Sequence, residues 1–541
     1  MGAKWKAATA IILFGISVCA VFGFWKYQEV DKKEDRIWHH ELAAGADPTL
    51  GSDTIPEDYM VDESFTSHLP LVIIDTGGEE IVNYKYYDKE TDAMLYPEGV
   101  DVYTKIQISV IDNQNSVNRI GEQPAITSSG KIKVRGNHSA LLPKHQYRIK
   151  LLDEEGEKSG QPLLGMEASD DWILNGTQTD RSYLRTYLAM NLMGEMQPYT
   201  PDLRYCEVII KKGGTYRYDG LYMMMEPIER GTGRVELSRY SPGNAAVPYL
   251  LKRDRYDASA LSIPSYLDNF PDKRQDWELE WDNDAVLSLV YPNKDKITGQ
   301  SIQKISDEIT ELEKALYSDD WMEFIQYRQM IDMESFCDYF IINEYLTSYD
   351  AGLHSTYFYK DIGGKIKMGP VWDFDGALDN GSHTLTDYNY IVMKQRPWFE
   401  CMIQDPVFVN KLCDRYKELR KGILSDENVK EKATEGLKFL GNAIERDSVR
   451  WGTEYEASSL DEVVEKSTGL LVQRECGNAQ GEVQRIIDFA ALHASYLDQH
   501  LYDIYVPWDG QKRRNSGLGI LFITAFFVSI ILVQRAREGL R

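Results

Sequence analysis

The sequence has few cysteines and no motif that would pair them. Six occur in 541 residues, at the scattered positions Cys19, Cys206, Cys337, Cys401, Cys413 and Cys476. No CxxC pair and no Cys/His cluster at zinc spacing is present. A structural zinc site and a dense disulfide framework are therefore unsupported.

An excess of positive charge is also missing. The net charge is −25, and no Lys/Arg-rich stripe with interleaved aromatics offsets it, so we expect no nucleic-acid partner. A phosphate-bearing ligand would need a divalent metal between its phosphates and the carboxylates of the protein. With 43% hydrophobic residues, the chain can form one large globular unit or two lobes.

Long hydrophobic runs are confined to the two ends of the chain. Residues 5–25, "WKAATAIILFGISVCAVFGFW", and 516–533, "SGLGILFITAFFVSIILV", are each long enough to predict a transmembrane helix. A cleaved signal peptide is the alternative for the first run, but no small-x-small site follows it. The bilayer is therefore an expected partner.

Flanking charges predict the orientation of this two-pass cell-membrane protein. The positive-inside rule places both termini in the cytoplasm and the main domain outside, because basic residues precede the first run and follow the second: Lys4, Lys6, Arg535, Arg537 and Arg541. Lys512, Arg513 and Arg514 oppose this orientation.

The rest of the chain, outside these two runs, divides by pattern. A cytoplasmic stretch (1–4), a polar stalk or linker (26–67), a main domain (68–505), a juxtamembrane stretch (506–515) and a basic tail (534–541) are expected. Short apolar runs between turns predict strands over 69–251, and helical periodicity prevails from 301 onward. Within the strand-rich part, "TDRSYLRTYLAMNLMGEM" predicts a helix with Asp180 as its N-cap.

Two carboxylates are brought together by a predicted β-hairpin. "STYFYK" and "KIKMGPVW" flank the turn signal "DIGG". If Lys360 faces Lys365, Asp350 and Asp373 reach the same open end. The common alternative is that these aspartates are solvated loop residues. Paired carboxylates can, however, hold Mg²⁺ and orient an attacking hydroxyl in phosphoryl transfer. They can also catalyse the hydrolysis of a glycoside.

Several ordered segments carry a family resemblance: "RGN", "PKHQYRIKL", "LLGMEASDDWILNGTQTDRSYLRTYLA", "GLYMMMEPIERG", "STYFYKDIGGKIK" and "MGPVWDFD". Over about 69–424 the chain resembles the spore-coat protein H (CotH) kinase-like family. The resemblance implies that Asp350 is the catalytic base and that Asp373 binds the metal. Ser355 stands where many kinases have a metal-binding Asn, and Asp375 stands where they have the Gly of DFG, so these two are further candidate metal ligands.

Candidate phosphate-binding residues lie in the strand-rich part. In "HQYRIKL", alternation puts Arg148 and Lys150 on one strand face, which could hold the α- and β-phosphates or simply be solvated. Arg135 and Asn137 lie in a turn with a single Gly, so it is not a Gly-rich phosphate loop. Glu226 ends an apolar strand at the point where the chain would cross between the lobes. In kinase-like folds this region holds adenine, so Glu226 is a candidate nucleotide-binding residue.

These observations predict an α+β, two-lobed atypical protein-kinase-like fold, with a β-rich N-terminal half and a helix-rich C-terminal half, between two transmembrane helices. The expected protein is a membrane-anchored atypical Ser/Thr kinase of envelope or spore-coat proteins. It would use ATP as co-substrate and Mg²⁺ or Mn²⁺ as cofactor. The alternatives are a non-catalytic surface or envelope scaffold with the same fold and a two-carboxylate glycosidase.

Overall fold

The structure is a computed structural model of the whole chain. It describes residues 36–89, 93–113, 116–257, 259–269, 285–380, 384–385, 388–457, 462–465, 471–473 and 477–508. Both predicted transmembrane segments, 5–25 and 516–533, lie outside these residues.

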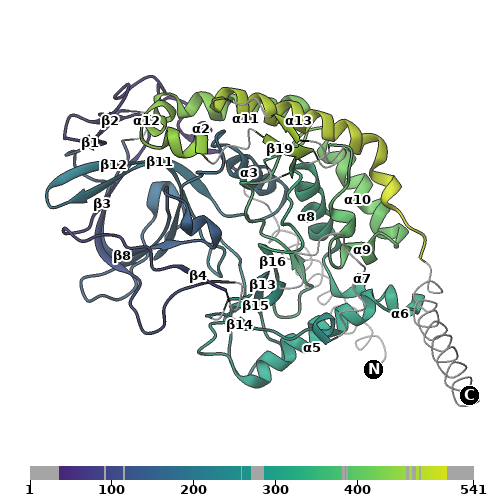
Figure 1. Cartoon of the computed structure of the whole chain (residues 1–541). Helices are drawn as coiled ribbons and strands as arrows, with labels where there is room; N and C mark the ends of the chain where they lie inside the picture. Colours follow the sequence, from purple (N-terminus) through teal and green to yellow (C-terminus); the bar gives the residue numbers. More distant parts are fainter. Residues whose placement is uncertain are drawn as a thin grey trace, which may run out of the picture.

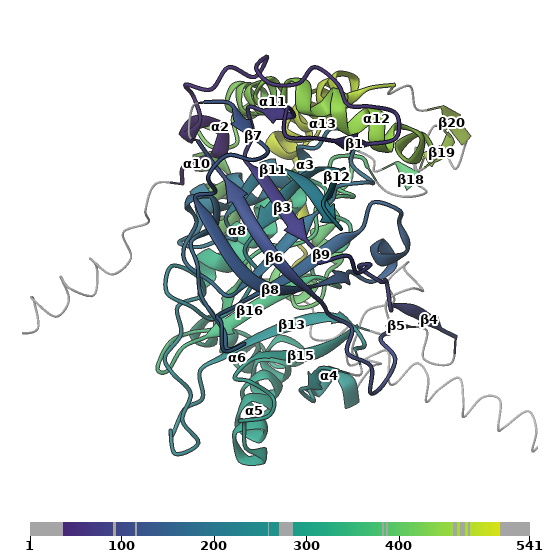
Figure 2. The same cartoon turned by 90° about the vertical axis from the view of Figure 1, so that its left-hand side faces the viewer.

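Seven strands of the N-terminal half form a sheet that closes on itself (Figures 1 and 2). Closure arises because β11 pairs in parallel with β3 on one side and antiparallel with β12 on the other. Strand β12 in turn pairs antiparallel with β10. In sheet order the strands are β12 (Thr215–Met225), β10 (Asp171–Asn175), β9 (Gln146–Leu152), β8 (Ile126–Arg135), β6 (Thr104–Ile111), β3 (Leu71–Asp75) and β11 (Leu203–Lys212). The short strand β1 (Met60–Val61) adds to β12.

Side-chain alternation explains the two faces of this closed sheet. Apolar residues from all seven strands fill its interior, among them Trp172 and Tyr222. On β8, buried Ile132 and Val134 alternate with half-buried Lys133 and Arg135, which therefore lie on the outer face. The predicted alternation on β9 is confirmed in the same way, because Tyr147, Ile149 and Leu151 are buried.

A second sheet carries the predicted hairpin. Its strands, in order, are β14 (Leu261–Ser262), β15 (Ala285–Tyr291), β13 (Tyr249–Arg255), β16 (Thr356–Lys360) and β17 (Lys367–Met368). Tyr359 faces Lys367, so the register differs by one residue from the one expected. The Gly364 N–H donates to the Asp361 carbonyl at 3.0 Å, and the loop is one residue longer than predicted.

Smaller pairings complete the strands. A short hairpin joins β4 (Tyr86–Asp88) to β5 (Ala93–Leu95), β2 (Thr66–Ser67) pairs with β7 (Asn118–Arg119), and β18 (Thr384–Leu385), β19 (Glu462–Glu465) and β20 (Leu471–Gln473) form a three-stranded sheet.

Most of the helices come after β15 in the chain, and several begin at a side-chain cap. The helices are α2 (His39–Leu42), α3 (Arg185–Met196), α4 (Tyr266–Asn269), α5 (Gly299–Leu316), α6 (Trp321–Phe324), α7 (Tyr327–Met330), α8 (Met333–Tyr345), α9 (Phe399–Met402), α10 (Pro406–Leu419), α11 (Asp426–Leu440), α12 (Asn442–Ala457) and α13 (Ala479–His500). Caps that accept a backbone N–H include Thr298, Asp332, Asp405, Ser425 and Asn478.

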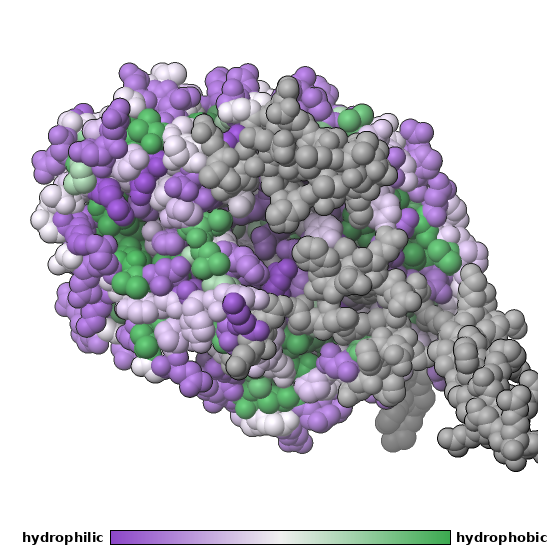
Figure 3. Space-filling model, viewed as in Figure 1, coloured by the Kyte–Doolittle hydropathy of each residue, from purple (hydrophilic) through white to green (hydrophobic). Residues whose placement is uncertain are grey.

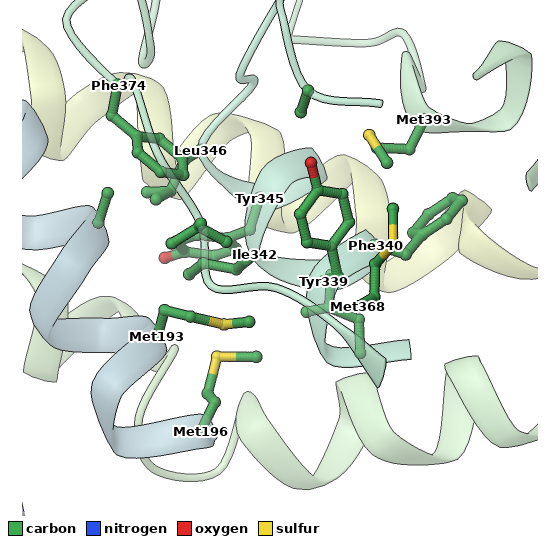
Figure 4. Packing of buried hydrophobic residues seen from close by; sticks show 14 of the residues in the cluster. Met193, Met196, Tyr339, Phe340, Ile342, Tyr345, Leu346, Met368, Phe374 and Met393 are labelled. Atoms are coloured by element: carbon green, nitrogen blue, oxygen red, sulfur yellow. The ribbon is translucent and has the colours of Figure 1, made fainter. Parts of the chain in front are cut away.

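Helix α3 lies at the centre of the molecule and is buried along nearly its whole length. Met193 and Met196 of α3 pack near Ile342 and Tyr345 of α8 in the main hydrophobic core (Figure 4). Asp180, expected as the N-cap, precedes the helix by several residues, and its carboxylate accepts the Arg185 N–H at 2.9 Å. A buried ion pair of 2.9 Å joins Arg185 to Glu482 and so ties α3 to α13.

Residues expected to form a linker are instead part of the packed structure from Arg36 onward. Trp38 is fully buried, and Arg36 donates to Asn191 at 2.9 Å. Helix α12 lies against the closed sheet and is held there by two fully buried ion pairs. Arg446 pairs with Glu207 at 2.6 Å, and Asp447 pairs with Lys144 at 2.9 Å.

The predicted fold class was wrong in its architecture. The β-rich N-terminal half of the predicted two-lobed, kinase-like fold is instead a closed sheet, because β11 bonds to both β3 and β12. Such long-range pairing leaves no trace in local strand patterns. Within the described part of the chain, no helix has the length and apolarity needed to cross a membrane; the two predicted transmembrane segments lie outside that part.

Replacing Glu207 by Gln should lower the free energy of unfolding by about 3 kcal/mol, because Arg446 would keep a buried charge without its counter-charge. The control, Glu334→Gln, breaks the more exposed pair with Lys411 and should cost less than about 1 kcal/mol. Denaturant unfolding measures both variants. Equal, small losses would contradict this role of the buried pair.

Candidate functional site

A cavity of about 1030 Å³ lies between the closed sheet and the hairpin sheet. Its walls come from β8, β9, α3, β13, β16 and the segments that follow β8 and β17. Figure 3 shows hydrophilic side chains gathered around a hollow near the middle of this face. Its size is at the upper end of the range for small-molecule sites.

One wall of the cavity is acidic and follows the hairpin. Asp350, Asp373, Asp375 and Ser355 all line it. The Ser355 hydroxyl donates to an Asp373 carboxylate oxygen at 3.2 Å, and the Thr186 hydroxyl of α3 donates to Asp375 at 2.8 Å. The structure therefore brings together the four residues that the hairpin and the family resemblance suggested.

Electrostatic repulsion is concentrated at Asp373. Burial and then the charges of Asp350 and Asp375 raise the pKa of Asp373 to about 7, although the Ser355 hydroxyl opposes the shift. The Asp373 side chain is nevertheless exposed to solvent in the cavity. Burial and then the charge of Asp180 raise the pKa of Asp375. A cation placed between these groups would relieve the repulsion.

The backbone at this wall is unusual. Asp373 has a φ of 68° and Ser355 a φ of 48°, both in the left-handed region that non-glycine residues seldom adopt. Such conformations persist where the surrounding structure enforces them, and they gather at functional sites.

The facing wall is basic and belongs to the outer face of the closed sheet. Arg135 and Arg148 line the cavity. The Arg135 guanidinium donates to Gln146 at 2.7 Å and lies over the Trp372 ring, 5.8 Å from its centroid. Arg148 makes two 2.8 Å bonds to the Asp171 carboxylate.

Of the remaining predicted site residues, one lines the cavity and two do not. Asn137 lines the cavity. Lys150 does not line it; its ammonium donates to Asp171 at 2.7 Å. Glu226 is also absent from the lining and is buried, where it accepts from the Tyr199 hydroxyl at 3.1 Å.

Other charged residues of the cavity were not predicted from the sequence. They are Lys85, Lys133, Lys252, Asp254, Arg255 and Asp257. The alternation in "KIKVR" could have placed Lys133 beside Arg135. No local pattern distinguishes Lys85, which reaches the cavity through a distant hairpin.

The oxygen donors of the acidic wall suit a hard divalent cation. Among the described residues, no group of three His, Cys, Asp or Glu side chains could enclose a metal ion alone. Mg²⁺ characteristically uses one or two carboxylates and completes its octahedron with water and substrate phosphates. The carboxylates of Asp373 and Asp375 fit that pattern.

A comparison with known protein families identifies the family of this chain. A family model described as CotH kinase protein matches residues 132–497. The chain therefore belongs to the CotH kinase family, as the sequence resemblance implied. No curated protein matches the chain.

Asp373→Asn should make the metal-free protein more stable at pH 8 but not near pH 4. A raised pKa means that the folded state holds a proton that the unfolded state releases between pH 4 and 7, so wild-type stability falls as pH rises through that window. Asn avoids this loss, with an expected gain of about 1 kcal/mol after solvent screening.

Denaturant unfolding in EDTA at both pH values measures this effect, and Asp414→Asn on the surface of α10 serves as the control. A gain for Asp373→Asn that is the same at pH 4 and pH 8 would show that charge repulsion is not its source.

Proposed function

We propose that the chain is a protein Ser/Thr kinase that transfers the γ-phosphoryl group of ATP to envelope or spore-coat proteins. The proposal is supported above all by the two facing walls of one cavity, with Asp350, Asp373 and Asp375 opposite Arg135 and Arg148. Phosphoryl transfer requires cations along a triphosphate and an acid that orients the attacking hydroxyl. A two-carboxylate glycosidase has no need of the basic wall.

Each residue has a role in this proposal. Asp373 and Asp375 would hold Mg²⁺ or Mn²⁺, which when bound neutralises charge on the phosphate oxygens. Arg135 and Arg148 bind phosphate oxygens with guanidinium donors that match their geometry. Ser355 keeps the Asp373 carboxylate oriented, and Thr186 does the same for Asp375.

The reaction forms one bond and breaks one. The substrate hydroxyl oxygen bonds to the γ-phosphorus while the bond from that phosphorus to the bridging β,γ-oxygen breaks, and ADP leaves. Asp350 accepts the hydroxyl proton as the general base. Because positioning and electrostatics supply most of the catalysis in this chemistry, the preset walls contribute more than proton transfer alone.

Phosphate incorporation tests the activity. With ATP, Mn²⁺ and a generic protein substrate, Asp350→Asn should reduce the rate by about 100-fold or more through loss of the base. Asp373→Ala should reduce it by about 1000-fold through loss of electrostatic stabilisation. Asp414→Asn serves as the control and should keep full activity; equal incorporation by all four proteins would reject the kinase assignment.

Nucleotide and metal binding separates a kinase from an inactive scaffold. ATP at about one hundred times its Kd should stabilise the fold by about 2.7 kcal/mol, and only when Mg²⁺ or Mn²⁺ is present. Thermal unfolding with ATP, with metal and with both measures this coupling. An unfolding temperature that none of the three additions changes would indicate a non-catalytic scaffold.

A further inference from the structure

Two lysines lie against one tyrosine ring in the cavity. The Lys85 Nζ is 4.7 Å and the Lys133 Nζ 4.2 Å from the centroid of the Tyr96 ring. All three residues line the cavity. Lys133 also lies 5.1 Å from the ring centroid of Tyr103. Both ammonium groups thus lie within cation–π distance of the same ring.

Neither ammonium forms an ion pair with a carboxylate of the described residues. Lys85 donates to the Met94 carbonyl at 3.3 Å. Lys133 stands directly opposite Arg148 in the β8–β9 pairing, and like charges in that arrangement repel. Burial and then Arg148 lower the pKa of Lys133 to about 8. The two ammonium groups therefore have no bonded carboxylate among the described residues, although the charge of Asp257 acts on both.

Arg135 links the lysine pair electrostatically to the acidic wall. The charge of Asp373 acts on Arg135, and the charge of Arg135 acts on Lys85. Asp257 is the acid whose charge acts most strongly on Lys85.

Exposed aromatic residues are close in sequence to two cavity residues. Lys85 directly precedes Tyr86 and Tyr87 of β4, which are 47% and 44% exposed, and Tyr256 beside Asp257 is 46% exposed. Aromatic side chains are enriched in surfaces that bind polypeptides. Both Lys85 and Tyr96 precede the segment matched by the family model, 132–497.

We propose that Lys85, Lys133 and Tyr96 form an anion subsite that binds an acidic side chain of the protein substrate close to the residue to be phosphorylated. This inference rests on the proposed kinase function. The ligand group is a carboxylate or a phosphate ester on a polypeptide. The nucleotide's own phosphates are the competing source of the same chemistry.

The test compares two peptides on the full chain. One carries a serine flanked by glutamates, and the other has glutamines in their place. By fluorescence anisotropy without nucleotide, the wild type should bind the glutamate peptide about tenfold more tightly. The double variant Lys85→Gln/Lys133→Gln should lose this preference.

Lys131→Gln is the matched control, since Lys131 lies on the same strand over the Tyr103 ring, 4.7 Å from its centroid, and does not line the cavity. It should keep the tenfold preference. The double variant Lys85→Arg/Lys133→Arg should also keep it, which separates lost charge from lost packing.

Measuring the Kd for ATP with Mg²⁺ distinguishes the two sources of the anion. An unchanged Kd in the Gln double variant supports the substrate subsite. A weakened ATP Kd with peptide preference intact assigns the lysines to the nucleotide and overturns the proposal. If the wild type prefers the glutamate peptide but transfers no phosphate, only the kinase function is rejected. If it transfers phosphate but does not prefer the glutamate peptide, only the subsite is rejected.

Discussion

The mutual repulsion of the aspartates behind the hairpin is the constraint that the rest of the site depends on. Carboxylates in a partly desolvated cavity separate unless the backbone is fixed by other interactions. Phe374, between Asp373 and Asp375, is fully buried in the main core (Figure 4), and burying such a ring contributes about 2–3 kcal/mol. The Leu378 N–H also donates to the Leu346 carbonyl at 2.7 Å. Hydrophobic packing and backbone bonds thus hold like charges together.

The position of the basic wall depends on which strands of the closed sheet are covered by the hydrophobic core around α3. Residues of β10, β11 and β12 are buried on both faces, because Ile173, Leu203 and Met223 pack into the core that contains α3. Among the described residues, that core includes none from β8 or β9, and Lys133 and Arg148 on their outer face line the cavity. Helix α3 also supplies Thr186 to the acidic wall. The packing of one helix therefore sets both the sheet surface and the position of a carboxylate.

Local sequence patterns predicted those features of the fold and the site that depend on residues close together in the chain. Alternation placed Arg148 on the outer face of β9, and the glycine turn placed Asp350 and Asp373 at one cavity. Closure of the sheet escaped prediction because it depends on β3 meeting β11, more than a hundred residues later in the chain. For the same reason the sequence could not reveal that Asp171 would engage Lys150. Lys85 reaches the cavity only through tertiary contacts.

The charged groups around the cavity have two kinds of partner. Arg148, which lines the cavity, and Lys150, which does not, both bind the Asp171 carboxylate, which offsets their charge. Arg135, in contrast, is oriented by the neutral amide of Gln146, and Asp373 is oriented by the hydroxyl of Ser355. A direct bond between Arg135 and Asp373 would cancel both charges and leave little to attract a ligand. Neutral partners fix these groups in place while their charge stays available, which is the electrostatic preorganisation that catalysis of phosphoryl transfer requires.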